Sequence, residues 1–296
     1  MVSFGMKKAK EKLTLFMQNA RPTSARQVPA TPGPASCFVM IYAIMSDVHA
    51  NPAALAAAVA DARSRGCSRF VLLGDVTGYG YDVKGAMKLV RENFDVVLMG
   101  NHDSACLGLE PKYEVSSNRN YWVDVMQREV LSEDDRGWLR GRPYLHIEGD
   151  MAFVHGDFTN PSAWNYVFSI QSAVVSFFSR TERILFCGHT HHAAAWEMHG
   201  SGFVRPRLLR HLSRPAVRAD TRSFALKGGS RYVVNVGSVG HPRADRCSTY
   251  VIYDSDADRL TFRRLPVDLV AYAAALDRAG VDQPLWLHDA IMRMGG

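Results

Sequence analysis

Histidine, aspartate and asparagine side chains recur in five short motifs, and each motif directly follows an apolar run that predicts a buried strand. In chain order the motifs are SDVHAN (46–51), GDVTGYG (74–80), GNHD (100–103), VHGD (154–157) and GHTH (188–191). In an open α/β sheet, the loops at the carboxyl ends of the strands converge on one crevice, so we expect the five motifs to meet in space. Their convergence would collect two carboxylates, one carboxamide and five imidazoles: Asp47, His49, Asp75, Asn101, His102, His155, His189 and His191.

These donor types indicate a metal site. Nitrogen and oxygen donors without thiolates favour transition metals of intermediate hardness, which include manganese, iron, cobalt, nickel and zinc. His189 and His191 are two residues apart after a strand, so each imidazole can reach a different ion of a close pair. Two divalent ions, the carboxylates of Asp47 and Asp75 and a bridging hydroxide leave about one positive charge, which would attract a phosphate oxygen. His102 is left over to protonate the leaving oxygen.

The elements that must position these motifs alternate along the chain from residue 38 onward, which is typical of α/β layering. We predict strands over residues 38–45, 70–73, 96–99, 144–147, 151–154, 184–187, 232–236, 249–253 and 260–265. We predict helices over residues 51–66, 83–94, 117–141, 169–182 and 267–279. Asn51 is the expected N-cap of the first helix, and Ser132 and Asp135 have the spacing of a capping box.

The composition fits a chain that buries a core, with 296 residues, 47% hydrophobic and 22% charged. The longest apolar run, 37–45, falls well short of the roughly 20 residues that cross a bilayer, so we predict no transmembrane segment. The five cysteines are scattered and never spaced as CxxC. This spacing argues against a disulfide framework and fits the reducing cytoplasm.

The net charge of +6 is unevenly distributed, because residues 1–40 alone carry six basic side chains and one acid. We predict that residues 1–37 form a disordered basic extension and that residues 38–296 form a single domain. The remainder of the chain is nearly neutral, which does not favour a nucleic-acid-binding body. A second basic segment, from Arg205 to Arg231, has eight basic residues and one acid. It either overhangs the site and contacts an anionic substrate or is a solvated loop.

The order DxH, GD, GNH(D/E), H and GHxH resembles the motif series of the calcineurin-like metallophosphoesterase superfamily, over residues 40 to about 290. The resemblance implies an α/β fold, a four-layer α-β-β-α sandwich of two mixed sheets flanked by helices. It implies one metal held by Asp47, His49, Asp75 and His191, and a second held by Asp75, Asn101, His155 and His189. It also implies that Asp75 bridges the metals and that His102 is the catalytic histidine. Such a histidine usually pairs with an acidic residue, for which Asp103 and Asp47 are the candidates.

The sequence departs from the motifs of two groups of this superfamily, which narrows the choice of group. Serine/threonine phosphatases have an arginine where Tyr79 stands, and purple acid phosphatases need a tyrosine where Gly78 stands. The segment NVGSVGHPR (235–243) resembles the NPGSVGQPR of small prokaryotic YfcE-like phosphodiesterases, with His241 in place of a glutamine. We expect His241 and Arg243 to contact the substrate.

The residues and the resemblance together predict a metal-dependent hydrolase of phosphate esters, phosphodiesters rather than phosphomonoesters, with a metal-bridging hydroxide at a dinuclear centre. The expected cofactors are two divalent transition-metal ions, manganese first, and the expected substrate is a phosphoester small molecule or nucleotide. A nuclease or a dinucleoside polyphosphate hydrolase would use the same site. A protein-binding scaffold of the same fold is a further alternative, although such scaffolds usually have eroded ligands and all the ligands are present here.

Overall fold

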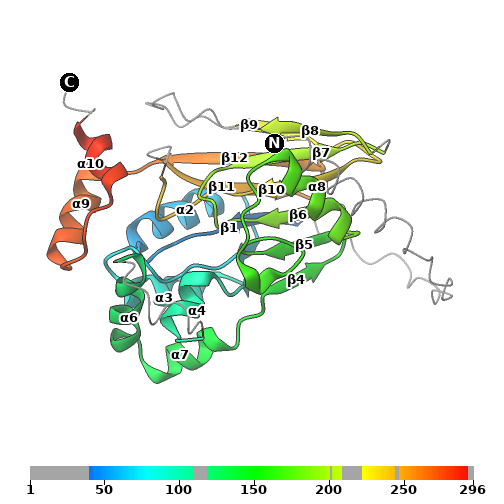
Figure 1. Cartoon of the computed structure of the whole chain (residues 1–296). Coiled ribbons are helices and arrows are strands. Elements are labelled where there is room, and N and C mark those ends of the chain that lie inside the picture. The colour runs from blue at the N-terminus through cyan, green and yellow to red at the C-terminus, as the bar shows by residue number, and fades with distance from the viewer. Residues whose placement is uncertain (1–39, 110–118, 201, 209–221, 244–246, 293–296) are drawn as a thin grey trace, which may run out of the picture. The chain divides into compact units, whose positions relative to one another are not determined.

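The computed structural model describes residues 40–109, 119–200, 202–208, 222–243 and 247–292 (Figure 1). The predicted basic extension, 1–37, lies outside these residues and stays a prediction. None of the helices in the described residues combines the length and the hydropathy that crossing a bilayer requires.

The first sheet has six strands in the order β3-β2-β1-β11-β12-β9. β1 (Ile41–Met45), β2 (Arg69–Leu72) and β3 (Val96–Val97) are parallel, with the helices α2 (Pro52–Ser64) and α3 (Val83–Asn93) between them in the chain. β11 (Cys247–Asp254), β12 (Arg259–Pro266) and β9 (Arg222–Ala225) continue the sheet with antiparallel pairing. Asn51 caps α2, as predicted, by accepting a hydrogen bond from the backbone N–H of Ala54.

The second sheet also has six strands, in the order β4-β5-β6-β10-β7-β8. β5 (Met151–Val154), β6 (Ile184–Cys187) and β10 (Arg231–Asn235) are parallel. β4 (Leu145–Glu148), β7 (Ala194–Met198) and β8 (Val204–Leu208) pair with antiparallel neighbours. Both sheets are therefore mixed. The helix α8 (Ile170–Ser179) precedes β6 in the chain.

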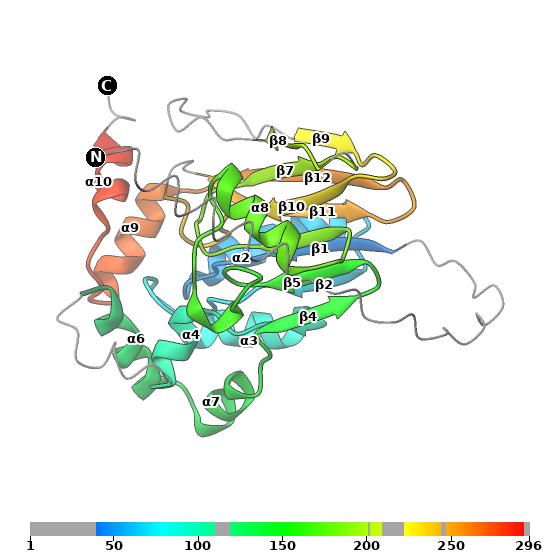
Figure 2. The same ribbon diagram turned by 45° about the vertical axis from the view of Figure 1, so that its right-hand side comes forward.

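Alternating side chains of the strands divide the interior into layers. Figure 2 shows α8 in front of the strands and α2 behind them. In β1, Tyr42 and Ile44 pack between the two sheets, whereas Ala43 and Met45 pack toward α2 and α3. On the far side of the second sheet, Phe177 of α8 packs against the strands. The order of layers is α-β-β-α, which confirms the predicted fold class.

The prediction of one helix over 117–141 was wrong, because α6 (Arg119–Val130) and α7 (Glu133–Arg140) are separate helices. Ser132 between them is extended, and its hydroxyl accepts a hydrogen bond of 3.1 Å from the backbone N–H of Asp135. The cap that the sequence showed thus starts a new helix. The sequence also gave no prediction of α4 (Asn101–Cys106), the 3-10 turn η1 (Pro161–Ala163), β7, β8, β9 or α10 (Leu285–Met292).

The last two helices, α9 (Leu269–Arg278) and α10, lie together at one end of the sheets, well separated from α8 (Figure 1). They share a buried apolar cluster with α6, to which Val123, Tyr272, Leu276 and Leu287 contribute. This contact brings α6 and α10 to the same end of the molecule as the candidate site.

Candidate metal centre

The five motifs meet at the carboxyl ends of the parallel strands, as predicted. Backbone hydrogen bonds join their loops: Asp47 donates to Gly74 at 3.1 Å, and His49 donates to Asp75 at 2.9 Å. In the second sheet, Gly188 donates to His155 at 2.9 Å. A loop between β10 and β11 completes the arrangement.

One group of donor atoms forms around His49. Its Nε2 lies 3.1 Å from Nε2 of His191 and 3.6 Å from both Oδ1 of Asp47 and Oδ2 of Asp75. Nε2 of His191 is 3.1 Å from Oδ1 of Asp47. All four side chains are buried.

A second group forms around His155 and shares one atom with the first. Nε2 of His155 lies 3.2 Å from Oδ2 of Asp75, 3.1 Å from Oδ1 of Asn101 and 3.2 Å from Nδ1 of His189. Asp75 Oδ2 therefore borders both groups, which is the position expected of a bridging ligand.

These separations fit metal ligation. A metal bound by nitrogen and oxygen at about 2.1 Å places neighbouring ligand atoms about 3.0–3.5 Å apart. Oδ1 of Asp47 and Oδ2 of Asp75 are buried and have no hydrogen-bond partner among the described residues. A buried carboxylate oxygen without a partner is costly, and a cation would stabilise both.

The imidazole tautomers also fit. Each of the four histidines has one ring nitrogen against a backbone carbonyl oxygen, which can only accept, so that nitrogen carries the hydrogen. The contacts are His49 to Thr77 at 2.8 Å, His191 to His241 at 2.7 Å, His155 to Leu73 at 3.2 Å and His189 to Trp164 at 2.9 Å. The other ring nitrogen of each histidine faces the cluster, where it can bind a metal through its lone pair when the ring is neutral.

The backbone of the ligand loops is strained. Non-glycine residues with positive φ are uncommon, and such strain gathers at functional sites where the surroundings hold it in place. Five of the predicted ligands adopt it: Asp47 (φ 58), His49 (φ 47), Asp75 (φ 56), His189 (φ 66) and His191 (φ 61).

The protonation states suit cation binding. Burial lowers the pKa of His189 to about 3 and that of His191 to about 4, so both rings are neutral. Burial opposes charge on Asp75, but the neighbouring His155 holds the pKa of Asp75 below its usual value. Burial also opposes charge on His155, but Asp75 raises the pKa of His155 to about 9. Without a metal, the pair of Asp75 and His155 would therefore retain a proton. This retained proton shows that the cluster stabilises a positive charge, as a metal site does.

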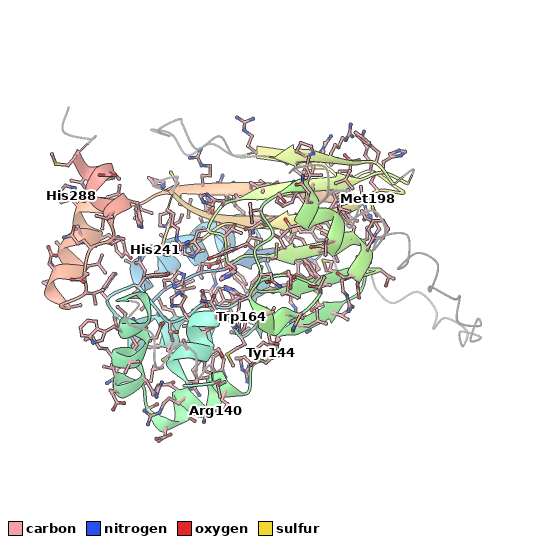
Figure 3. All side chains as sticks on the ribbon, in the orientation of Figure 1. Arg140, Tyr144, Trp164, Met198, His241 and His288 are labelled. Carbon is pink, nitrogen blue, oxygen red and sulfur yellow. The ribbon has the colours of Figure 1, made fainter. Side chains whose placement is uncertain are left out.

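A cavity of about 550 Å³ opens above the cluster. Asp75, Asn101, His189 and His191 lie at its base, and its walls are Tyr79, His102, Ala163, Trp164, Tyr166, His241, Arg243, Pro284 and Trp286. Figure 3 places Trp164 toward β4 and β5, and His241 toward α9 and α10. The two predicted substrate contacts, His241 and Arg243, thus lie in the wall of this cavity.

The sequence model of the calcineurin-like phosphoesterase superfamily domain matches residues 40–258. The chain belongs to this superfamily. A metallophosphoesterase from Sphaerobacter thermophilus has a similar structure, with a TM-score of 0.68 and 30% identity, covering 82% of this chain and 95% of that one. An uncharacterised protein of Methanocaldococcus jannaschii is 26% identical over 234 residues, which are 77% of this chain and 88% of that protein. The E. coli phosphoesterase YfcE is 17% identical, with a TM-score of 0.36, over 73% of this chain and 90% of its own.

Membership of the calcineurin-like superfamily makes the chain a hydrolase of phosphoesters.

The acidic partner of His102 differs from both candidates that were named from the sequence. Nδ1 of His102 lies 2.9 Å from Oδ2 of Asp124, on α6. Asp103 instead accepts hydrogen bonds from the backbone N–H groups of Asp75 and Thr77. Asp47 faces His191, so neither candidate named from the sequence pairs with His102.

Sequence reasoning also missed Gln127, one turn after Asp124 on α6. Its Oε1 accepts a hydrogen bond of 2.7 Å from the backbone N–H of Gly78, and its Nε2 donates to the carbonyl of Gly80 at 3.2 Å. Both bonds fix the loop that carries Tyr79. The only signal in the sequence was that Asp124 and Gln127 are polar residues among apolar residues of a predicted helix. An ordinary exposed helix face has the same pattern.

Three arginines of the basic segment 205–231 contact groups away from the metal cluster. Nη2 of Arg205 lies 2.8 Å from Oε2 of the buried Glu197 and Nε of Arg207 lies 3.5 Å from it. Arg231 donates to backbone carbonyls at the end of α8, including that of Phe177 at 2.8 Å. These contacts lie at the start of β10, whereas the ligand loops lie at its other end. Of the two alternatives for this segment, contact with the substrate does not hold for these three arginines, and 209–221 lies outside the described residues.

Proposed function

We propose that the protein hydrolyses phosphodiesters at a dinuclear centre of divalent transition metals, with manganese as the first choice. The observation that carries the proposal is the pair of buried donor groups that share Oδ2 of Asp75 at the base of the cavity. Asp47, His49, Asp75 and His191 would hold one ion, and Asp75, Asn101, His155 and His189 the other. When bound, such an ion pair supplies an activated water and charge stabilisation for a phosphoryl group.

In this proposal, His102 donates the proton that the leaving oxygen needs. Burial disfavours its charged form, but the carboxylate of Asp124 raises the pKa of His102 above its ordinary value. That carboxylate therefore favours the imidazolium form, and the ring lines the cavity. General acid catalysis by such a group is worth about 10²- to 10⁴-fold in rate.

In this proposal, Arg243 and Tyr79 bind the phosphoryl oxygens. Nη2 of Arg243 donates a hydrogen bond of 3.1 Å to the Tyr79 hydroxyl oxygen, which leaves the phenolic hydrogen free to donate onward. No carboxylate in the described part of the chain pairs with Arg243, although it faces a cavity that would take an anion. Arg243 is the one guanidinium that the described residues place in the wall, and it suits the single negative charge of a diester.

The cavity volume supports a diester over inorganic phosphate or a bare monoester. About 550 Å³ is within the range of sites that hold small organic ligands and exceeds what one phosphoryl group fills. The cavity also extends past the ligands toward Tyr166 on one side and Trp286 on the other. A phosphate with two organic substituents can use both directions.

The proposed location is the cytoplasm. Three cysteines in the described residues, Cys67, Cys106 and Cys187, are buried and free, which suits a reducing compartment. Fractionation of cells that express the protein at its natural level, followed by immunoblotting, tests this placement, and recovery in an extracytoplasmic fraction would contradict it.

A substrate panel tests the proposed activity. Protein reconstituted with manganese is assayed on bis(p-nitrophenyl) phosphate, p-nitrophenyl phosphate, cyclic nucleotides, a dinucleoside polyphosphate and single-stranded DNA. We expect kcat/KM for the diester to exceed that for the monoester by at least an order of magnitude, and chelation to abolish both. A preference for the monoester would overturn the diester assignment. Metal-loaded protein that turns over none of the panel would favour the scaffold alternative.

A further inference from the structure

Two aromatic side chains face the cavity from opposite sides of the metal cluster. Tyr166, in the loop between β5 and α8, stacks on His189 with ring centroids 4.3 Å apart and planes 16° apart. Its side chain is 47% exposed, so the stacked ring still offers surface to the cavity that it lines. His189 belongs to the donor group around His155.

Trp286 faces the cavity from the other side. Its Nε1–H donates a hydrogen bond of 3.0 Å to Nε2 of His241, and the two rings are perpendicular. The ring of Tyr272 lies nearly parallel to it at 6.5 Å, within the apolar cluster of α9 and α10. Trp286 is therefore held in one orientation before any ligand arrives.

The Trp286 side belongs to the other donor group. The backbone carbonyl of His241 accepts a hydrogen bond of 2.7 Å from Nδ1 of His191, which faces Asp47 and His49. In Figure 3, His241 lies toward α9 and α10, whereas Trp164, two residues before Tyr166, lies toward β4 and β5. One aromatic wall thus stands at each end of the dinuclear cluster.

His102, the proposed general acid, lies on the same side of the cavity as Trp286. The ring of His102 lies 4.5 Å from that of Tyr79, and Tyr79 stacks on His241 at 4.4 Å with planes 17° apart. His102, Tyr79, His241 and Trp286 therefore form one continuous side of the cavity. The group that His102 protonates must leave on this side.

We propose that the substrate is a phosphodiester with a planar ring on each side of the scissile phosphate. Trp286 packs against the ring of the leaving group, and Tyr166 packs against the ring of the ester group that stays on phosphorus. Water adds its oxygen to phosphorus and loses one proton to solvent, the bond from phosphorus to the leaving oxygen breaks, and His102 supplies a proton to that oxygen. His102 then regains a proton from solvent, so the sum is one water consumed and one alcohol released. This assignment rests on the proposed function and adds the substrate class and its orientation.

Two substrates separate the two ring sites. Bis(p-nitrophenyl) phosphate has a ring on both sides, whereas methyl p-nitrophenyl phosphate has a ring only on the leaving group. The ratio of kcat/KM for the first substrate to that for the second reports the retained-group site, and comparing this ratio between variants cancels the intrinsic reactivity of the substrates. The variants are Tyr166→Leu and Trp286→Leu, each assayed with manganese bound and its metal content measured.

Matched controls come from the same elements or residue types. Phe168→Leu removes a 67% exposed ring whose centroid is 6.4 Å from that of Tyr166 and which does not line the cavity. Trp122→Leu removes an exposed tryptophan of α6 that also lies outside the cavity lining. Trp286→Phe keeps a ring but removes the N–H that bonds His241, which separates ring packing from positioning of His241.

Loss of one stacked ring is expected to change kcat/KM about fivefold or more. We expect Tyr166→Leu to lower the ratio by at least that factor, and Trp286→Leu to lower kcat/KM for both substrates alike, with partial recovery in Trp286→Phe. The controls should keep the wild-type ratio. An unchanged ratio in Tyr166→Leu, an equal change in Phe168→Leu, or a ratio that falls only in Trp286→Leu would overturn the assignment. If metal-loaded wild type cleaves neither diester, the proposed function itself fails, which the ratio alone would not show.

Discussion

Asp75 is the residue on which both donor groups depend, because its Oδ2 lies 3.6 Å from Nε2 of His49 and 3.2 Å from Nε2 of His155. Asp75→Asn removes the charge that faces both groups, so we expect it to weaken both metals and abolish turnover. His102→Ala should retain the metals and lose about 10²- to 10⁴-fold in rate. Elemental analysis beside steady-state kinetics separates the two variants. Loss of metal in His102→Ala equal to that in Asp75→Asn would make His102 a ligand.

Asp124 acts on the reaction through His102. Its carboxylate raises the pKa of His102 against the effect of burial, which favours the acid form of His102. The rate should therefore fall as pH rises through that pKa. Asp124→Asn removes the charge and lowers the pKa of His102. We therefore expect the alkaline limb of the kcat profile to move to lower pH, with metal content unchanged. A limb that stays in place would show that another group controls it.

The candidate metal ligands could be predicted from the sequence, but the acidic partner of His102 could not. The ligands follow strands in short motifs, so strand prediction alone brought Asp47, His191 and the others together. Asp124 is on a helix that reaches His102 only through packing of α6 against α4 and the C-terminal helices. No spacing in the sequence encodes that contact, so the two acids nearer in the motifs, Asp103 and Asp47, were chosen wrongly.

At the scale of elements, α6 holds the loop after β2, which carries Tyr79, through hydrogen bonds between Gln127 and the backbone of Gly78 and Gly80. Gly78 in this loop has φ +88, and a Cβ added there would lie 2.5 Å from Nδ1 of His102. Gly78→Ala should therefore displace the His102 ring and reduce kcat by at least tenfold while the protein stays folded. Gly137→Ala is the matched control, because a Cβ on this helical glycine of α7 meets nothing within 4 Å. The control should retain activity and gain up to about 1 kcal/mol of stability.

Circular dichroism and metal content accompany the kinetics of both glycine variants. Wild-type kcat in Gly78→Ala would show that the loop relaxes without moving His102. A loss of activity in Gly137→Ala would mean that the assay reports overall stability rather than the geometry of the loop.

Elements with a strong pattern were predicted to within a few residues, and the edge strands were not. β5 and β6 have the predicted bounds, because continuous apolar runs mark buried parallel strands. β8 and β9 lie at the edges of their sheets, where one side needs no partner and polar side chains are tolerated. β8 contains Pro206 between two arginines, a composition that does not favour a strand except at an edge.

At the scale of the whole molecule, Asp61 of α2 joins a helix layer to the first sheet. Its carboxylate accepts hydrogen bonds from Nε and Nη2 of Arg263, both at 2.9 Å, and from the Tyr250 hydroxyl at 2.6 Å. Burial opposes the charge, but these bonds lower the pKa of Asp61 to about 2. Asp61→Asn should reduce the free energy of unfolding by about 1–3 kcal/mol at neutral pH and leave metal content unchanged.

The pH dependence of that loss has a defined sign. The folded pKa of Asp61 is below the unfolded value of about 3.9, so the stabilisation is complete above that pH and disappears as pH falls toward 2. Denaturant unfolding of wild type and Asp61→Asn at pH 7 and at pH 2.5 should therefore show a smaller difference in acid. A difference that persists undiminished in acid would assign the effect to packing rather than to the carboxylate.

The central claim is that one chain holds two transition-metal ions on either side of Asp75. The most direct test is elemental analysis of protein reconstituted with manganese and freed of loosely bound metal, combined with anomalous scattering from its crystals. The predicted result is two manganese ions per chain, with one anomalous peak beside His49 and His191 and the other beside Asn101 and His155. A single ion per chain, or a site that takes only magnesium through its carboxylates, would contradict the claim.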